Sequence, residues 1–327
     1  MSELTTVPLL ELAPPYGPSL LRAHPERAAA LLAAAGRQYG KPVLSVSDAL
    51  SRRWAMRNAV PYLPEIAEVA GLLSTPGAWM LNLCYEWGCT TGIAEAPEGR
   101  GMRMMRTLDW PLDGLGRNVV VSRQLGTAGM WFNVTWPGFV GATTALAPGR
   151  FAAALNQAPM AEHGLGLVGN WVVNRCTVWR NGHVPPALLL RRVFDECASF
   201  DDAVRCLTET PIALPAIYSL AGAEHGRGVV IERLETSAHV HQAPICVTNH
   251  WLTPWLTGRP RSVHSHDRLD MMRGRMAAAA DGIAWLAAPI LNDTTRLAVT
   301  ANAATGELTV QGFEDGAPAT SVLRLVA

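Results

Sequence analysis

The sequence predicts an α+β protein in which a helical segment precedes two sheets faced by helices. Three observations support this. The first 88 residues resemble helices, strand-like segments dominate from residue 89 onward, and helical segments interrupt the groups of strands. The length of 327 residues suits one large domain or two modest ones. We therefore expect a division into residues 1–88 and residues 89–327.

The first part of the chain is expected to form helices. They are His24–Gly36, Ser45–Ala59 and Pro61–Leu73, followed by an apolar helix or strand at Ala78–Tyr85. Pro25 lies near the start of the first helix and Gly36 at its end, which are the favoured positions of these residue types. Ser47 is a candidate N-cap of the second helix.

Strands and helices alternate in blocks after residue 89. The first six expected strands are Thr90–Ala94, Met102–Leu108, Asn118–Arg123, Trp131–Trp136, Phe139–Thr144 and Phe151–Asn156. Two helices follow at Pro186–Glu196 and Ser199–Thr208, the second capped by Ser199. The remaining elements are strands Ala216–Ala221, Gly228–Arg233, Ala238–Gln242 and Ile245–Thr248, a helix Asp267–Ala280, and strands Arg296–Asn302, Glu307–Gln311 and Val322–Leu325.

Composition and charge exclude several classes of function. Hydrophobic residues make up 49% of the chain and charged residues 17%, which is enough apolar material for a core. The net charge is zero and no basic stripe occurs, so we expect neither a nucleic-acid partner nor an anionic membrane surface. The acidic N-terminus lacks the pattern of an export signal, and no apolar run reaches the ~18 residues of a membrane span. We expect a cytoplasmic protein.

Cysteine usage agrees with that compartment. The six cysteines show no CxxC pair and no metal-ligand spacing, so no metal site is expected.

The segment from Trp87 to Pro111 contains a candidate thiol nucleophile. It holds Cys89 and, after a turn, Arg106 and Asp109. If the chain were cut between Gly88 and Cys89, the freed α-amine, with a pKa of ~7.7–8.0, would serve as the base. Arg106 would stabilise the thiolate and Asp109 would orient the ammonium. The alternative is a buried core cysteine beside a surface ion pair.

Five groups of residues in a fixed order identify a resemblance. They are Cys89–Thr91 with Arg106–Pro111, Gly138–Pro159, Leu189–Gly222, Val247–Trp251 with Ser265–Arg268, and Ala288–Leu308. Together they resemble the acid ceramidase and N-acylethanolamine acid amidase family of N-terminal-nucleophile cysteine hydrolases, which is related to the choloylglycine hydrolases. The resemblance implies a four-layer αββα sandwich. Residues 1–88 would be a helical α-subunit or propeptide-like segment, and residues 89–327 the catalytic β-subunit.

The resemblance also implies a role for each site residue. These are Cys89 as nucleophile, Arg106 and Asp109 beside it, Asn249 and a backbone N–H near Asn156 as oxyanion donors, and Arg268 near the thiolate. The implied activity is hydrolysis of a small N-acyl amide through a thioester, after self-cleavage between Gly88 and Cys89. The two pieces would stay associated, and no metal or organic cofactor would be needed. Without the resemblance, Asn249 would be interpreted as a turn asparagine and Arg268 as a solvated helix charge.

Gln157 departs from the family pattern. The family has a glutamate at this position, and an amide cannot accept a proton as a carboxylate does. This departure concerns self-cleavage more than the fold. The expected absence of an export signal is a second departure from the family, since its well-known animal members are lysosomal.

The substrate is predicted only as a class. Tryptophans are frequent near the predicted site, and Trp131, Trp136 and Trp251 are candidates to line a pocket for an apolar or lipid acyl group. Core packing is the alternative for them. Two other functions remain open: a papain-like hydrolase pairing Cys89 with His250 or His266, and an unprocessed, non-catalytic relative that acts as a binding protein.

Overall fold

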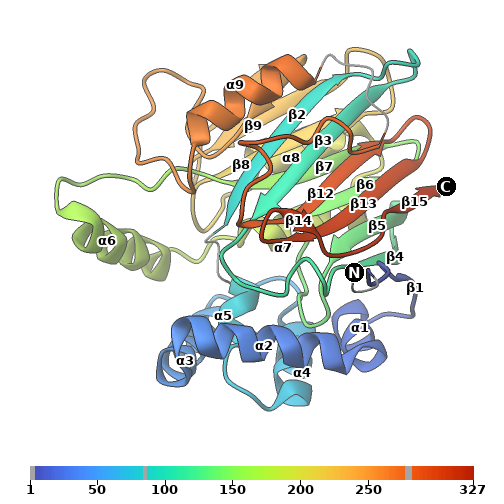
Figure 1. The fold of residues 1–327 in the computed structure, drawn as a ribbon. Coiled ribbons are helices and arrows are strands. Elements are labelled where there is room, and N and C mark those ends of the chain that lie inside the picture. The colour runs from blue at the N-terminus through green and yellow to red at the C-terminus, as the bar shows by residue number, and fades with distance from the viewer. Residues whose placement is uncertain (1–3, 84–86, 277–281) are drawn as a thin grey trace.

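Two sheets are stacked face to face in the computed structural model, which describes residues 4–83, 87–276 and 282–327 (Figure 1). Among these residues, one sheet has eight strands in the order β1-β4-β5-β6-β7-β8-β9-β10. Their bounds are β1 Leu9–Glu11, β4 Val120–Gly126, β5 Gly129–Thr135, β6 Thr144–Ala147, β7 Phe151–Gln157, β8 Ala216–Gly222, β9 Gly228–Arg233 and β10 Ala238–Gln242.

The second sheet has the order β11-β2-β3-β12-β13-β14, with β15 also paired to β13. Its bounds are β11 Ile245–Val247, β2 Gly88–Glu95, β3 Met102–Asp109, β12 Thr295–Asn302, β13 Glu307–Glu314, β14 Ala317–Pro318 and β15 Leu323–Val326. Every residue of β3 is buried, because the other sheet covers one face of this strand and helical or loop segments cover the other.

Helices cover both outer faces of the stacked sheets. Helices α7 (Pro186–Glu196) and α8 (Phe200–Glu209) pack on the eight-stranded sheet, and α9 (Ser265–Arg275) packs on β2 and β11 of the other (Figure 1). The expected αββα order of layers is thereby confirmed. Ser199 caps α8, as predicted, because its hydroxyl accepts a hydrogen bond from the backbone N–H of Asp202 at 3.1 Å.

Five helices from the first part of the chain pack beside one end of the sheets (Figure 1). They are α1 Tyr16–Ala23, α2 Pro25–Tyr39, α3 Lys41–Arg57, α4 Leu63–Leu73 and α5 Ala78–Leu83. Helix α2 ends at Gly40, whose φ of 81° favours glycine. Helix α3 then begins at once with Pro42 in its first turn, so Ser47 lies inside the helix and the predicted cap is wrong.

Polar contacts of Asn82 and Arg191 help to join these helices to the rest of the fold. The side-chain amide of Asn82 donates to the carbonyl of Gly138 at 2.8 Å, and its oxygen accepts from the backbone N–H of Val140 at 2.8 Å. Arg191 of α7 forms a two-pronged ion pair with Glu65 of α4, at 2.8 and 2.9 Å. Both contacts are largely buried, so each fixes the position of the helices relative to the sheets.

The strand predicted at Phe139–Thr144 does not form, and β6 begins only at Thr144. Asn82 satisfies the backbone of this segment at Gly138 and Val140, and the N–H of Ala142 donates to the carbonyl of Ala187. The segment is therefore a loop whose hydrogen bonds go to α5 and α7 instead of a strand.

Among the described residues, four elements were not expected from the sequence: β1, α1, β14 and the helix α6 (Gly166–Arg180). Asn170 is the buried residue of α6, so this helix lacks the apolar stripe by which amphipathic helices are recognised. The predicted segments Ala78–Tyr85 and Asp267–Ala280 extend beyond the described residues, and Cys84 also lies outside them. In the described part of the chain, no helix is both long and apolar enough to cross a bilayer.

We predict that Arg191→Ala lowers the free energy of unfolding by about 3–5 kcal/mol, because it leaves the Glu65 carboxylate in a largely buried site without its cation. Urea unfolding followed by circular dichroism measures the change. Arg123→Ala is the control, since its pair with Glu11 is exposed and should contribute less than about 1 kcal/mol. Equal losses in the two variants would contradict the prediction.

Candidate active site

Cys89 lies at the second position of β2, in the middle of the stacked sheets. The β2–β3 register places Cys89 opposite Leu108 and Gly88 opposite Asp109. Side chains alternate between the two faces of a strand. Cys89 and Arg106 therefore point toward the eight-stranded sheet, whereas Thr90 and Asp109 point toward α9. The residues predicted around Cys89 are thus brought together, but on two different faces of one sheet.

Arg106 is the cation beside the thiol. Its Nη2 lies 3.2 Å from Sγ of Cys89 and donates to the carbonyl of Leu155 at 2.8 Å. Its Nη1 donates to Oδ1 of Asn156 at 2.6 Å, and its Nε to the hydroxyl of Thr144 at 2.7 Å. These acceptors hold the planar guanidinium in one orientation.

Asn156 therefore holds Arg106 through its side chain, which the sequence did not indicate. Oδ1 of Asn156 also accepts from the hydroxyl of Thr91 at 2.8 Å, and its Nδ2 donates to the carbonyl of Thr248 at 3.1 Å. The predicted role of a backbone N–H near Asn156 stays a prediction. Thr91 and Thr144 were missed, because a threonine in a strand is common and carries no mark of a site.

Burial and charge act in opposite directions on the thiol. Burial raises the pKa of the fully buried Cys89 thiol, and the positive charge of Arg106 opposes that rise. Arg106 thus supplies the largest favourable influence on the thiolate.

Arg268 contacts the other side of the same residue. Its Nη1 donates to the backbone carbonyl of Cys89 at 2.7 Å and to the hydroxyl of Thr90 at 2.9 Å, and lies 3.3 Å from Oδ2 of Asp109. Arg268 is fully buried, so it is not a solvated helix charge. Its hydrogen bonds go to the backbone of Cys89 and not to the sulfur.

Asp109 is fully buried between Arg268 and Thr295, whose hydroxyl donates to Oδ1 at 2.9 Å. Burial raises the pKa of Asp109, and the charge of Arg268 opposes this. The orientation of an ammonium by Asp109 stays a prediction.

Asn249 connects the two faces. Its Oδ1 accepts from the backbone N–H of Cys89 at 2.7 Å and from Nη2 of Arg268 at 3.1 Å, while its Nδ2 donates to the carbonyl of Gln157 at 2.8 Å. Its own backbone N–H donates to the hydroxyl of Ser265 at 3.2 Å. Asn249 is therefore more than a turn residue, because its side chain fixes the atom that would become the α-amine.

The two histidines interact with each other rather than with the thiol. The rings of His250 and His266 lie 3.9 Å apart, and Nδ1 of His250 lies 2.9 Å from the hydroxyl of Ser265. Burial, together with the neighbouring His266, lowers the pKa of His250 to about 4. Among the described residues, the Cys89 thiol hydrogen-bonds to Arg106 and to the Leu155 carbonyl, and to neither histidine.

Gly88 is tightly enclosed. A methyl group on its Cα would lie 2.3 Å from the hydroxyl oxygen of Ser262 and 3.3 Å from Cβ of Asp109. Any side chain here would displace the loop that contains Ser262. This contact was not expected, because the sequence places Ser262 outside every motif.

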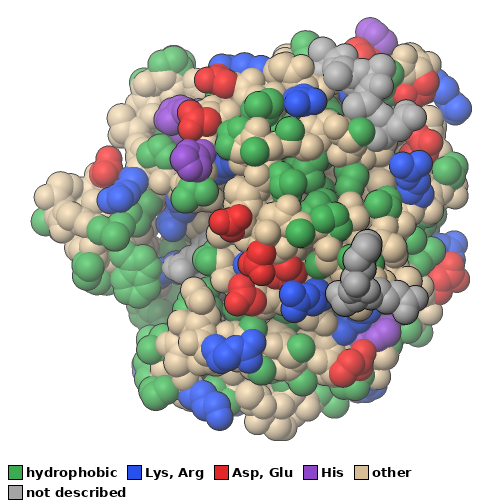
Figure 2. Space-filling model, viewed as in Figure 1, with side chains coloured by type: hydrophobic (Ala, Val, Ile, Leu, Met, Phe, Trp, Pro, Cys, Tyr) green, Lys and Arg blue, Asp and Glu red, His purple; other side chains and the backbone are tan. Residues whose placement is uncertain are grey.

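An opening of about 720 Å³ lies beside Gly88 and Asp109. Its wall includes Leu167, Val168 and Trp171 of α6, and Figure 2 shows hydrophobic side chains gathered over this helix. Gln157 also lines the opening, and its Oε1 is buried without a hydrogen-bond partner in the described structure. Gln157, which departs from the family pattern, thus lines the same opening as Gly88.

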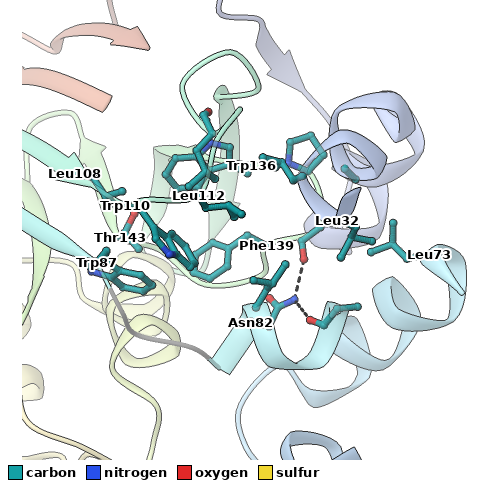
Figure 3. Close-up of a pocket in the computed structure, with 17 residues that line it drawn as sticks. Leu32, Leu73, Asn82, Trp87, Leu108, Trp110, Leu112, Trp136, Phe139 and Thr143 are labelled. Atoms are coloured by element: carbon teal, nitrogen blue, oxygen red, sulfur yellow. Dashed lines mark hydrogen bonds between the residues drawn. The ribbon is translucent and has the colours of Figure 1, made fainter. Parts of the chain in front are cut away.

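A second, smaller cavity of about 60 Å³ lies between the N-terminal helices and the sheets. Figure 3 shows Leu32 and Asn82 on one side, with Trp110, Trp136 and Phe139 on the other. Its lining is almost entirely apolar, and Trp87 lines both this cavity and the opening beside Gly88. Trp87 therefore separates the two spaces.

The three predicted pocket tryptophans have different positions. Trp136 lines the apolar cavity. Trp131 is fully buried, its ring stacks on Phe194 of α7 at 5.1 Å between centroids, and its Nε1 donates to Asp195. The prediction that Trp131 lines a pocket is therefore wrong, because this residue packs in the core. Trp251 packs against an apolar cluster with Ile217 and Val247, which favours the alternative of core packing.

Among the described residues, no three acidic, His or Cys side chains are grouped as metal ligands would be.

We predict that Arg106→Ala slows alkylation of Cys89 by about tenfold or more at neutral pH, because the loss of the cation raises the thiol pKa further. The pH profile of alkylation, followed by mass spectrometry of the Cys89 peptide, should move to higher pH. Arg106→Lys should recover part of the rate. Arg103→Ala changes a buried arginine on the other face of β3 and should have little effect. Equal rates in wild type and Arg106→Ala would refute the role of Arg106.

Parts of this chain are similar to known proteins. Residues 158–280 match the family described as acyl-coenzyme A:6-aminopenicillanic acid acyl-transferase. The chain is 28% identical over 179 residues to the N-acylethanolamine-hydrolyzing acid amidase of Mus musculus. This match covers 53% of this chain and 47% of that protein. It is also 28% identical over 193 residues to the acid ceramidase of Bos taurus, with the same coverage of 53% and 47%. The chain thus spans about half the length of the curated relatives it matches.

A solved structure supports the fold. The Caenorhabditis elegans ortholog of N-acylethanolamine-hydrolyzing acid amidase superposes with a TM-score of 0.50 at 16% identity, over 66% of this chain and 93% of the other. The four-layer sandwich of N-terminal-nucleophile hydrolases is therefore the fold of this chain. In sequence, the chain resembles the acid ceramidase and N-acylethanolamine acid amidase family.

Proposed function

We propose that this protein is a self-processing amidohydrolase that cleaves a small N-acyl amide through Cys89. The observation that supports it most strongly is the double contact of Cys89. Its thiol lies 3.2 Å from Nη2 of Arg106, and its backbone N–H is bound by Asn249 at 2.7 Å. A nucleophile and the nitrogen that would become its base are thus fixed within one residue.

Maturation would use the thiol on the preceding peptide bond. Sγ of Cys89 attacks the carbonyl carbon of Gly88, the C–N bond breaks, and the acyl group moves from nitrogen to sulfur. Water then hydrolyses the thioester, which releases the carboxylate of Gly88 and leaves Cys89 with a free α-amine. The enclosure of Gly88 by Ser262 supports this step, because it restricts the orientations of the scissile bond.

Turnover would repeat the same chemistry on a substrate. The thiolate attacks the amide carbonyl, the protonated α-amine gives its proton to the leaving amine, and water hydrolyses the thioester. Asn249 would release the Gln157 carbonyl and direct its Nδ2 to the oxyanion. Loss of one such donor typically raises a barrier by ~3–4 kcal/mol. Asp109 and Arg268 would hold the ammonium and the Cys89 carbonyl in place.

The two pieces, residues 1–88 and 89–327, would stay associated after the cut. The first piece shares an apolar cluster with the second, formed by Ile66 and Val69 together with Val140 and Leu188. The buried ion pair between Glu65 and Arg191 also joins them. An interface of this kind has the character of a protein core and does not depend on the severed bond.

The substrate would be an amide with an apolar acyl group. The names of the similar proteins refer to N-acylethanolamines and to ceramide, which are both N-acyl amides. In this chain, displacement of Trp87 after the cut would join the apolar cavity to the opening beside Gly88. The acyl chain would then lie among Leu32, Trp136 and Phe139.

Two other functions are less well supported. A papain-like mechanism requires a histidine at the thiol, and the rings of His250 and His266 are directed to each other and to Ser265. An unprocessed binding protein would not need a buried arginine at the sulfur, since burying a cation is costly.

We predict that purified wild-type protein separates into two fragments split between residues 88 and 89, which elute together in gel filtration. Cys89→Ala should stay a single chain of 35.1 kDa, because the nucleophile of the self-cleavage is absent. Intact-mass spectrometry makes the measurement. Cys246→Ala, which changes another buried cysteine, should be cut like wild type. Cleavage of Cys89→Ala at the same bond would exclude self-cleavage by this thiol.

We predict that kcat/KM for N-acyl fluorogenic amides from C2 to C16 rises steeply with acyl length until the pocket is full. Each buried CH₂ should contribute about 0.8 kcal/mol, or roughly fourfold. Leu32→Trp fills part of the apolar cavity and should move the optimum to shorter chains. Leu125→Trp, at a position 69% exposed outside the cavity, should leave the optimum unchanged. A flat profile in all three proteins would exclude the cavity as the acyl site.

A further inference from the structure

Two cysteines lie together outside the site described above. Cys197 follows the last residue of α7, and Cys206 lies in the last turn of α8. Both cysteines line the same surface depression, so their side chains are neighbours. Cys197 is buried and Cys206 is partly exposed. The pair thus combines one accessible thiol with one sheltered thiol, the arrangement found where a reactive cysteine has a resolving partner.

The surroundings of Cys206 favour its thiolate. Nη2 of Arg192 lies 3.9 Å from its Sγ, and the hydroxyl of Thr210 lies 3.8 Å from the same atom. Arg192 also donates to that hydroxyl at 3.1 Å, which holds the guanidinium in place. The neighbouring Cys197 thiol is the largest influence that lowers the pKa of Cys206, to about 6, with Thr210 and Arg192 acting in the same direction.

Cys197 is affected in the opposite direction. The neighbouring Cys206 thiol, burial, and the nearby carboxylates of Asp202 and Glu196 all raise the pKa of Cys197. Arg150 faces the same residue and donates to its backbone carbonyl at 2.8 Å. Cys206 is the expected nucleophile of the pair, because it is the more accessible cysteine and the guanidinium of Arg192 lies beside its sulfur.

The pair is accessible from outside. A surface depression of about 600 Å³ is lined by both cysteines, and three carboxylates, those of Glu196, Asp202 and Glu209, stand around it. Arg205 at the rim is paired with Asp202. These carboxylates disfavour anionic reagents such as glutathione disulfide and admit a small neutral oxidant.

We propose that Cys197 and Cys206 form a modification site that reacts with a neutral hydroperoxide to give an intramolecular disulfide. The Cys206 thiolate attacks one oxygen of the peroxide. The O–O bond breaks, the sulfur becomes a sulfenic acid, and the other oxygen leaves as hydroxide or alkoxide. The Cys197 thiol then attacks that sulfur, an S–S bond forms, and water departs. The two thiols together give two electrons to the peroxide.

This chemistry is separate from the proposed hydrolysis. Cys89 is fully buried and its thiol pKa is raised, so hydroperoxide should reach Cys206 before it reaches Cys89. The disulfide would join the end of α7 to α8 on the outer face of the eight-stranded sheet. It would also protect Cys206 from irreversible oxidation to the sulfinic acid.

The test treats the full-length protein with hydrogen peroxide, blocks remaining thiols with iodoacetamide, and maps tryptic peptides by mass spectrometry. Cleavage at Arg205 places the two cysteines in separate peptides, so a disulfide appears as a crosslinked pair that dithiothreitol dissolves. Cys197→Ser should accumulate a sulfenic acid at Cys206 that dimedone traps. Arg192→Gln should slow the reaction several-fold, because the cation at the thiolate is lost.

The matched control is Cys176→Ser, since Cys176 is an exposed cysteine on α6. This variant should form the crosslink at the wild-type rate, and circular dichroism should show that all variants are folded. Oxidation of Cys176 before Cys206 in the wild type would overturn the proposal. Peroxide-treated protein in which Cys206 stays a thiol, or becomes a sulfinic acid without the crosslink, would overturn it equally.

Discussion

The antiparallel pairing of β2 with β3 is the constraint on which the site depends. Because Cys89 is opposite Leu108, the thiol and Arg106 share the face between the sheets, and Asp109 is directed to α9. A shift of one residue would exchange these faces and separate the thiol from its cation. The register also places the Gly88–Cys89 bond at the end of the strand, next to the opening lined by α6.

Removing two arginine side chains from water destabilises the folded state, and their hydrogen bonds offset this effect. Arg106 and Arg268 are both fully buried. Each donates to backbone carbonyls and to side-chain oxygens, so the donors of each guanidinium are extensively satisfied. The charges are therefore fixed before any reaction, which is the condition under which an electrostatic group stabilises a developing charge most effectively.

The sequence predicted most of the helices and strands and the residue types at the site, but not the directions in which the site side chains point. Strand β3 and helix α7 follow from apolar patterns and turns that are local in the sequence. The contact of Arg106 with Asn156 joins residues from different sheets, and no local pattern encodes it. Helix α6 could not be predicted because apolar residues such as Val168 and Trp171 are exposed on it. Its sequence therefore does not separate into an apolar buried face and a polar exposed face.

Two thiols in opposite surroundings show how one fold can separate two reactivities. Cys89 lies where burial raises the thiol pKa and the charge of Arg106 opposes that rise. Cys206 is partly exposed and has the guanidinium of Arg192 beside its sulfur, so we expect it to react without a separate base. The sheets that exclude water from Cys89 also exclude oxidants from it. A chain that relies on a thiol for its own cleavage would gain from this separation, because oxidation of Cys89 would abolish the nucleophile.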